Sequence, residues 1–170
     1  TAVNALLPHV LSEAPRAVFD ADALNAIAGD SALQILLAAR ASKGQQTVLT
    51  PHPLEAARLL GSDTATTVQS NRLAAARALA VRFQSVVVLK GSGSIVAAPD
   101  ATPLINLSGN ARLATGGTGD VLAGMIGASM AAGSDALAAS RAAVWRHGAL
   151  ADGCPTDRPL SASALATGSC

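Results

Sequence analysis

Short apolar runs alternate with stretches of helical spacing along this chain of 170 residues. The runs at 16–19, 47–50 and 85–89 are mostly apolar and rich in β-branched residues, which is typical of strands buried on both faces of a parallel sheet. Helical spacing occurs at 2–14 (weakened by Pro8), 31–42, 54–61 and 68–84, and two alanine-rich helices are predicted over 120–132 and 135–152. This alternation indicates an α/β protein.

The third strand is followed by two further runs, SIVAAPD and TPLINLSG, with no helical stretch between them. They predict a hairpin and therefore an antiparallel edge on a mostly parallel sheet. We find no internal repeat, charged linker or low-complexity segment, and the length suits one domain with a core. We expect one α/β domain over residues 1–170, with helices on both faces of a doubly wound sheet.

Composition excludes several classes of function. The net charge is +1 and no basic block is present, so we expect no nucleic acid or membrane partner. No apolar stretch reaches the roughly 20 residues of a membrane span, and the N-terminus lacks a basic region before its apolar part. Cys154 and Cys170 form no metal or redox motif, and we expect reduced thiols in a cytoplasmic protein.

Polar segments follow four of the predicted strands: DADALN at 20–25, TPHPLE at 50–55, KGSGS at 90–94 and SGNARLATGGTGD at 108–120. Ligands of open α/β sheets bind outside the carboxyl ends of the strands, so four such segments on one rim indicate a binding site. Each has a structural alternative. DADALN, predicted as a loop, could cap a helix through Asp20 or Asp22; TPHP could be a turn with an incidental histidine, and KGSGS a β-turn.

The segment GGTGD is the strongest of the four. Gly116, Gly117 and Gly119 allow backbone N–H groups to face inward, and the helix predicted to start near Asp120 adds its unpaired amides and the positive end of its dipole. This combination is suited to a phosphate. Asp120 then stands where a carboxylate could accept a proton from an attacking hydroxyl, although a purely structural helix cap is the alternative. The spacing matches neither a Walker A loop nor a dinucleotide fingerprint.

Together TPHPLEAARLLG, VVLKGSGSIVA and LATGGTGDVLAGMIGA, with DADALN before them, resemble the ribokinase-like superfamily and most closely its NAD(P)H-hydrate dehydratase branch. The resemblance runs from about Thr1 to Ala166 and implies a three-layer α/β/α ribokinase-like fold. It also implies repair of hydrated NADH or NADPH, NAD(P)HX, driven by ADP or ATP. The terminal phosphate of the nucleotide passes to the ring hydroxyl, and phosphate then leaves to regenerate the dihydropyridine.

The same resemblance assigns residues. Asp120 matches the base that contacts the substrate hydroxyl. The backbone of Gly116, Gly117, Thr118 and Gly119 matches the anion hole. Contacts to the adenine nucleotide are implied for Lys90, Gly91, Ser92, Gly93, Ser94 and Gly119. Contacts to substrate are implied for His52, Asp22 and Asn25. Because Asp120 is the one carboxylate in its segment, we expect no permanent metal site and only Mg²⁺ that accompanies the nucleotide.

The sequence departs from the family pattern in three places. Leu54 replaces the glycine of the usual TPHPGE, Ala111 stands where a proline is common, and KGSGS varies the usual KGAGT. None of these changes removes a functional group. Family domains are longer, so the chain resembles their C-terminal portion; a domain without its first strands would expose a sheet edge, and we expect a homo-oligomer. An epimerase domain could precede this portion in a full-length protein.

Two other classes of function remain open at this stage. One is a kinase of the same fold that acts on a hydroxymethylpyrimidine, a thiazole or a sugar, and it would share Asp120 and the glycine segment. The other is an inactive fragment that binds nucleotide without turnover. DADALN and TPHP favour the dehydratase. A kinase would leave a stable phosphorylated product, whereas a dehydratase releases reduced nicotinamide and free phosphate.

Overall fold

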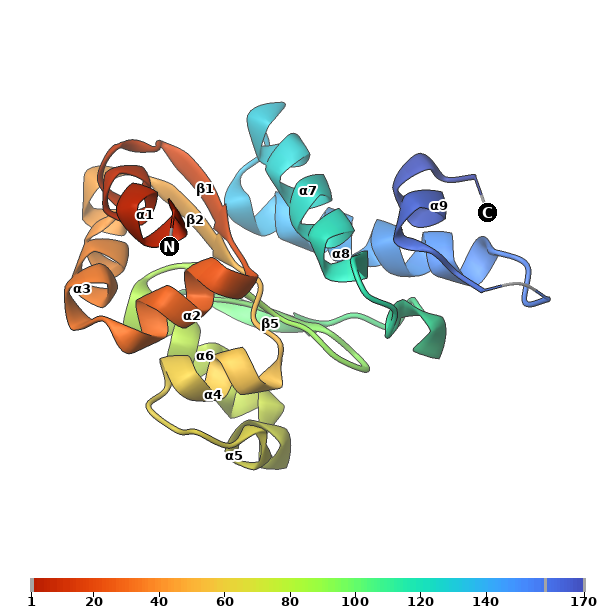
Figure 1. Ribbon diagram of the computed structural model, residues 1–170, viewed down its shortest axis with the longest axis horizontal. Coiled ribbons are helices and arrows are strands. Elements are labelled where there is room, and N and C mark those ends of the chain that lie inside the picture. The colour runs from red at the N-terminus through yellow and green to blue at the C-terminus, as the bar shows by residue number, and fades with distance from the viewer. Residues whose placement is uncertain (1, 158, 170) are drawn as a thin grey trace.

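The computed structural model describes residues 2–157 and 159–169, and within them five strands form one sheet. The strands are β1 (Arg16–Phe19), β2 (Gln46–Leu49), β3 (Val86–Leu89), β4 (Ile95–Ala98) and β5 (Ala101–Ile105), and they lie in the sheet in chain order (Figure 1). The first three are parallel, whereas β4 is antiparallel to both β3 and β5. The carboxyl ends of β1, β2, β3 and β5 therefore meet at one edge of the sheet.

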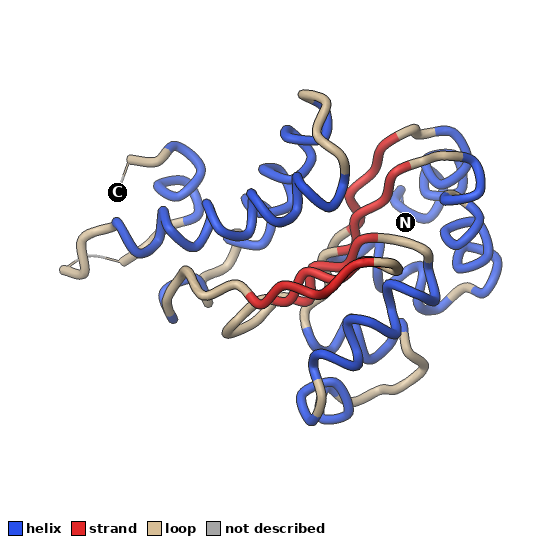
Figure 2. Tube along the Cα trace, turned by 180° about the vertical axis from the view of Figure 1, so that it is seen from behind, coloured by secondary structure: helices blue, strands red, loops and turns tan. Residues whose placement is uncertain are grey.

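Helices cover both faces of this sheet, which confirms the three-layer α/β/α prediction (Figure 2). One face carries α1 (Ala2–Glu13), α2 (Ala21–Gly29), α3 (Ser31–Ala39), α4 (Pro53–Leu59), α5 (Ala65–Ser70) and α6 (Arg72–Phe83). The other face carries α7 (Thr118–Ala131) and α8 (Ala136–Gly153), against which the short α9 (Ala162–Thr167) packs. The connections between the parallel strands all run over the first face, and the second is covered by helices that follow β5.

Alternation within the apolar strands divides the core into two layers. In β3, Val87 and Leu89 pack among the first six helices, whereas Val86 and Val88 pack against α7 and α8. All four side chains are buried. A strand that is apolar throughout can thus serve both faces at once, and this explains why the sequence shows a continuous β-branched run there.

Side-chain caps set the helix boundaries, and two of them correct the predicted elements. The single helix expected over 68–84 is wrong: it is divided at Asn71, whose backbone is not helical (φ −153°, ψ 76°) and whose side chain accepts from the amide of Ala74 at 3.0 Å to start α6. The segment at 20–25, expected as a loop, instead opens α2, with Asp20 as its N-cap. The helix α9 was not predicted.

A buried arginine fixes the first helix to the sheet. The guanidinium of Arg40 donates to the carbonyls of Val10, Leu11, Ala14 and Gln46 and to Thr47 Oγ1, and the side chain is almost fully buried. The last carbonyls of a helix lack the usual backbone partners, and Arg40 satisfies that of Leu11 and adds a second donor to that of Val10, which also accepts from the amide of Ala14. Burial lowers the pKa of Arg40.

Two expectations drawn from composition have separate outcomes. No helix in the described part of the chain is long and apolar enough to cross a membrane. The expectation of a reduced thiol is wrong at Cys154, which is disulfide-bonded. Cys170 lies outside the described residues.

Candidate active site

A pocket of about 790 Å³ lies where the polar segments meet at the carboxyl ends of the strands. Three of the four segments predicted at this rim line it, and α8 contributes one wall. Of the predicted site residues, the lining includes His52, Lys90, Gly91, Ser92, Gly93, Ser94, Gly116, Thr118 and Gly119. The fourth segment, at 20–25, reaches the site through Asp20.

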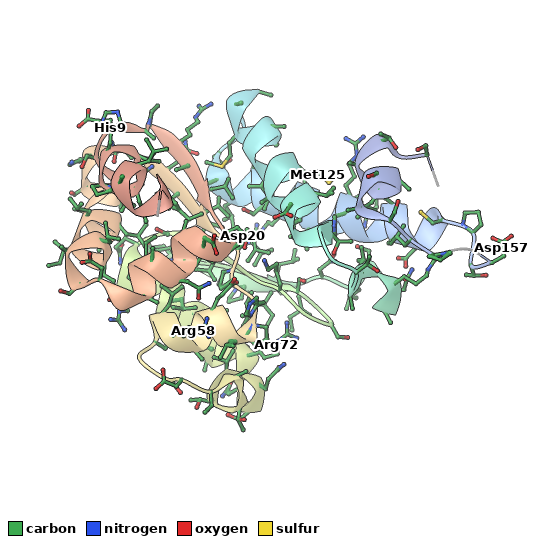
Figure 3. The ribbon with its side chains drawn as sticks, in the orientation of Figure 1. His9, Asp20, Arg58, Arg72, Met125 and Asp157 are labelled. Carbon is green, nitrogen blue, oxygen red and sulfur yellow. The ribbon has the colours of Figure 1, made fainter. Side chains whose placement is uncertain are left out.

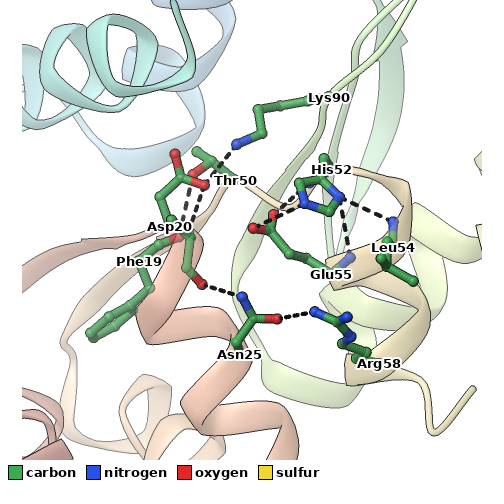
Figure 4. Close-up of polar contacts among 10 residues, drawn as sticks. Phe19, Asp20, Asn25, Thr50, His52, Leu54, Glu55, Arg58 and Lys90 are labelled. Atoms are coloured by element: carbon green, nitrogen blue, oxygen red, sulfur yellow. Dashed lines mark hydrogen bonds and ion pairs between the residues drawn. The ribbon is translucent and has the colours of Figure 1, made fainter. Parts of the chain in front are cut away.

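Lys90 and Asp20 form an ion pair beside this pocket (Figure 4). The Nζ of Lys90 lies 2.7 Å from Oδ1 of Asp20, and the two side chains are 21% and 13% exposed. The amide of Lys90 donates to the carbonyl of Pro51 at 2.9 Å, which joins the ends of β2 and β3. A Cβ placed on Gly119 would lie 3.4 Å from the same Nζ, so the ammonium group lies next to the start of α7.

The N-terminus of α7 is open toward the pocket. Its N-cap, Gly117, has the left-handed conformation (φ 86°, ψ −11°), and no side chain caps the helix. Among the described residues, the amides of Gly119 and Asp120 have no hydrogen-bond acceptor. Unpaired amides at the positive end of a helix of 14 residues, next to a lysine, form an arrangement suited to a phosphate.

Thr118 holds this turn in place from below. Its side chain is buried, and its hydroxyl lies 2.7 Å from the carbonyl of Leu113 and 2.8 Å from that of Thr115. Its amide also donates to Thr115. The hydroxyl and the amide of Thr118 are therefore used within the loop, and the amides that follow it remain available to a ligand.

One wall of the pocket is built by the loop after β5, which lies directly against α8. The Nδ2 of Asn106 donates to the backbone carbonyl of Ser108 at 2.9 Å. The hydroxyl of Ser108 in turn donates to the backbone carbonyl of Trp145 at 2.8 Å. A Cβ on Gly148 would lie 2.3 Å from Oγ of Ser108, so only glycine allows this approach. Asn106 was not among the predicted site residues, although it is the first polar side chain after the run PLI.

His147 joins α8 to the start of α7 and was also missed. Its Nε2 lies 2.9 Å from the carbonyl of Thr118, and the side chain is buried. Burial lowers the pKa of His147, and the hydrogen bond to Thr118 only partly offsets this effect. The ring is therefore neutral at pH 7 and donates from Nε2. A histidine inside an alanine-rich helix is a detectable signal, but the sequence does not show what it contacts.

His52 caps α4 as well as lining the pocket. Its Nδ1 accepts from the amides of Leu54 and Glu55 at 3.1 and 3.3 Å, while its Nε2 lies 3.3 Å from Oε1 of the buried Glu55 (Figure 4). Both ring nitrogens are thus engaged within one helix turn. The side chain is 47% exposed and lines the pocket.

The other predicted substrate residues lie away from the pocket lining. Asp22 is exposed in the first turn of α2, and Asn25 accepts from Nη1 of Arg58 at 2.7 Å, which ties α2 to α4 (Figure 4). Asp120 is exposed and directly follows Gly119, and like Gly117 it is not part of the lining. The structure therefore brings together the nucleotide and anion segments, with Asp120 at their margin.

Comparison with known sequences identifies relatives of this chain. A family model described as NAD(P)H-hydrate dehydratase matches residues 1–167. The ADP-dependent (S)-NAD(P)H-hydrate dehydratase of Neisseria meningitidis is 47% identical over 149 residues, which cover 88% of this chain and 49% of that protein. A bifunctional NAD(P)H-hydrate repair enzyme of Escherichia coli is 46% identical over 136 residues, 79% of this chain and 24% of that protein. The chain thus spans half or less of the length of these relatives.

Solved structures show the same fold. The ADP/ATP-dependent NAD(P)H-hydrate dehydratase of Bacillus subtilis, co-crystallized with ATP/Mg²⁺, superposes with a TM-score of 0.65 at 36% identity and covers 72% of this chain and 45% of its own. A ribokinase-like superfamily protein from Enterococcus faecalis, at 23% identity, covers 96% of this chain and 65% of its own with a TM-score of 0.63. The predicted resemblance is confirmed: this chain belongs to the NAD(P)H-hydrate dehydratase family.

Proposed function

We propose that this chain carries the nucleotide and phosphate-transfer site of an NAD(P)H-hydrate dehydratase that uses ADP or ATP. One observation supports this proposal above the others. The Lys90–Asp20 pair lies beside the open N-terminus of α7, in a pocket that is also lined by the KGSGS segment. A lysine and unpaired amides converging on one point favour an anionic ligand such as a terminal phosphate.

In the proposed reaction, the nucleotide phosphates lie between the 90–94 segment and the start of α7. Asp120 accepts the proton of the ring hydroxyl while the hydroxyl oxygen bonds to the terminal phosphorus of the nucleotide. The rest of the nucleotide leaves, and this leaving group is AMP when ADP is used. The amides of Gly119 and Asp120 stabilise the charge on the transferred group. The carbon–oxygen bond of the phosphate ester then breaks, phosphate departs, and loss of a proton from the adjacent ring carbon restores the dihydropyridine.

Magnesium fits this site as a companion of the nucleotide. Mg²⁺ is usually held by one or two carboxylates together with substrate phosphates and water. Residues 2–157 and 159–169 contain no group of three or more His, Cys, Asp or Glu side chains placed to bind a metal ion. Asp20, which pairs with Lys90, and Asp120, which follows Gly119, would hold Mg²⁺ together with the phosphate oxygens.

The direct test is an assay with hydrated NADH, ADP and Mg²⁺ that follows both the absorbance of the reduced ring and free phosphate. Because the chain covers only half of the Neisseria relative, it is assayed alone and as a replacement for the matching segment of that enzyme. We expect NADH and phosphate from the chimera. A stable phosphorylated product would instead indicate the kinase, and ADP binding without any turnover would indicate an inactive nucleotide-binding module.

Asp120→Asn tests the assigned base in the same chimera. We expect turnover to fall by roughly 10²- to 10⁴-fold, because general-base catalysis contributes about this much. ADP affinity measured without Mg²⁺ should be nearly unchanged, because Lys90 and backbone amides, and not the Asp120 side chain, form the proposed anion site. Asp100→Asn, in the exposed turn between β4 and β5, is the matched control. Full activity of Asp120→Asn would return Asp120 to a structural role.

A further inference from the structure

Arg72, the first residue of α6, supports the KGSGS segment from the side away from the pocket. Its Nη1 donates to the carbonyl of Ser92, and its Nη2 donates to those of Leu89 and Lys90 at 3.3 and 3.4 Å. The side chain lies close to the strand ends, above α5 in the view of Figure 3. It is not part of the pocket lining. One guanidinium group thus binds three carbonyls within four consecutive residues.

Gly91 makes room for this guanidinium. A Cβ on Gly91 would lie 2.8 Å from Nη2 of Arg72 and 3.2 Å from its Cζ, and the glycine has φ 146°. The backbone conformation disfavours any other residue here, and a Cβ would push the guanidinium out of this position. The glycine that looks like a turn residue in the sequence is therefore also the contact surface for an arginine.

The direction of the carbonyls fixes the direction of the following amides. In a trans peptide the C=O and the next N–H point to opposite sides, and the described backbone has no cis peptide bond. Since the carbonyls of Lys90 and Ser92 point at Arg72, the amides of Gly91 and Gly93 point away from it. Residues 90–94 line the pocket whereas Arg72 does not, which is consistent with amides that face the pocket, and neither amide has an acceptor among the described residues.

We propose that Arg72 is a positioning residue that turns the amides of Gly91 and Gly93 toward a phosphate group of the adenine nucleotide. This inference rests on the nucleotide site of the proposed function. The positive charge of Arg72 also favours a phosphate at this loop, because no carboxylate within the described residues is paired with the guanidinium. The guanidinium therefore acts through the loop: it holds the backbone and supplies a positive charge behind it, without touching the ligand.

The experiment uses this 170-residue chain labelled with ¹⁵N-glycine and titrated with ADP. In the wild type we expect ADP to shift the amide resonances of Gly91 and Gly93. Arg72→Met should raise the ADP dissociation constant at least about ten-fold and abolish both shifts, because each charged hydrogen bond to the loop is lost. Arg72→Lys keeps the charge but loses the forked guanidinium group that binds several carbonyls at once, and it should give an intermediate dissociation constant. Arg77→Met, exposed on the same helix, removes an equal charge and should bind as the wild type does.

The outcomes separate this inference from the proposed function. If Arg72→Met binds ADP with unchanged affinity, or if ADP does not shift the two glycine amides in the wild type, the inference is overturned whatever the activity of the chimera. If binding depends on Arg72 but the chimera forms no NADH, the inference stands and the proposed reaction fails. Should Arg72→Met not fold, the Arg72→Lys variant decides: wild-type affinity and shifts there contradict the role of the fork.

Discussion

Replacing Lys90 with methionine removes the ammonium group beside α7 and keeps the length of the side chain. A full charge pair about 4 Å apart is worth about 4 kcal/mol at an effective dielectric constant near 20. Lys90 is 21% exposed and already paired with Asp20 at 2.7 Å, so both water and the carboxylate reduce its effect on a phosphate. We expect a net loss of about 1–2 kcal/mol, which raises the ADP dissociation constant roughly 5- to 30-fold.

Part of that loss comes from Asp20 rather than from the lysine itself. In Lys90→Met the carboxylate of Asp20, which is 13% exposed, loses its ion-pair partner and faces the incoming phosphate. The double variant with Asp20→Asn removes this repulsion, so it should bind ADP more tightly than Lys90→Met alone. A double-mutant cycle measures the coupling between the two residues directly.

Calorimetric titration with ADP at fixed ionic strength is the appropriate assay, after far-UV circular dichroism has confirmed that each variant is folded. Lys43→Met is the control, since Lys43 is exposed in the turn before β2. An unchanged dissociation constant for Lys90→Met would show that the lysine only pairs with Asp20 to fix the strand ends. It would refute the phosphate contact that underlies the proposed function.

Two further predictions concern the turn and its support. Gly117→Val should abolish detectable ADP binding while the sheet stays folded, because Gly117 has φ 86° and an added Cβ would lie 3.0 Å from the Cβ of Ala162. The same calorimetry on Gly124→Val is the control, since a Cβ added at Gly124 has no atom within 4 Å. For His147, burial lowers the pKa in the folded state below the value near 6.5 in the unfolded state. The contribution of the neutral ring to the free energy of unfolding is therefore complete above pH 6.5, and it is lost as the pH falls through the folded-state pKa. Urea unfolding at about pH 7 and about pH 5 should show this loss in the wild type and a smaller one in His147→Gln.

The rim of the sheet could be predicted because its signals are local. Runs such as VVVL are apolar at every position, and the end of each run marks the carboxyl end of a strand wherever the strand lies in the fold. The segments at 50–55, 90–94 and 108–120 therefore had to meet if the strands were parallel. A three-layer arrangement follows from the same pattern, since strands buried on both faces need helices on both sides.

The local sequence pattern did not determine which acidic residue after β1 reaches the site. DADALN contains three polar side chains, and the family resemblance assigned substrate contacts to Asp22 and Asn25. In the structure α2 begins at Ala21, so Asp20 remains at the strand end beside Lys90, while Asn25 lies further along the helix against Arg58. A shift of about two residues in the start of a helix decides which carboxylate reaches the site, and boundaries of this kind depend on tertiary contacts.

Arg72 and His147 were missed for a different reason. Both side chains bind backbone carbonyls, Arg72 under the 89–92 turn and His147 at Thr118. A carbonyl is present at every position of a chain, so a contact of this type leaves no partner residue to recognise in the sequence. Catalytic segments are recognisable by their glycines and charges, but the residues that orient their amides become visible only when the helices behind them are in place. The site is therefore built in two parts: a rim encoded locally in the sequence, and a support that the packing of α6 and α8 supplies.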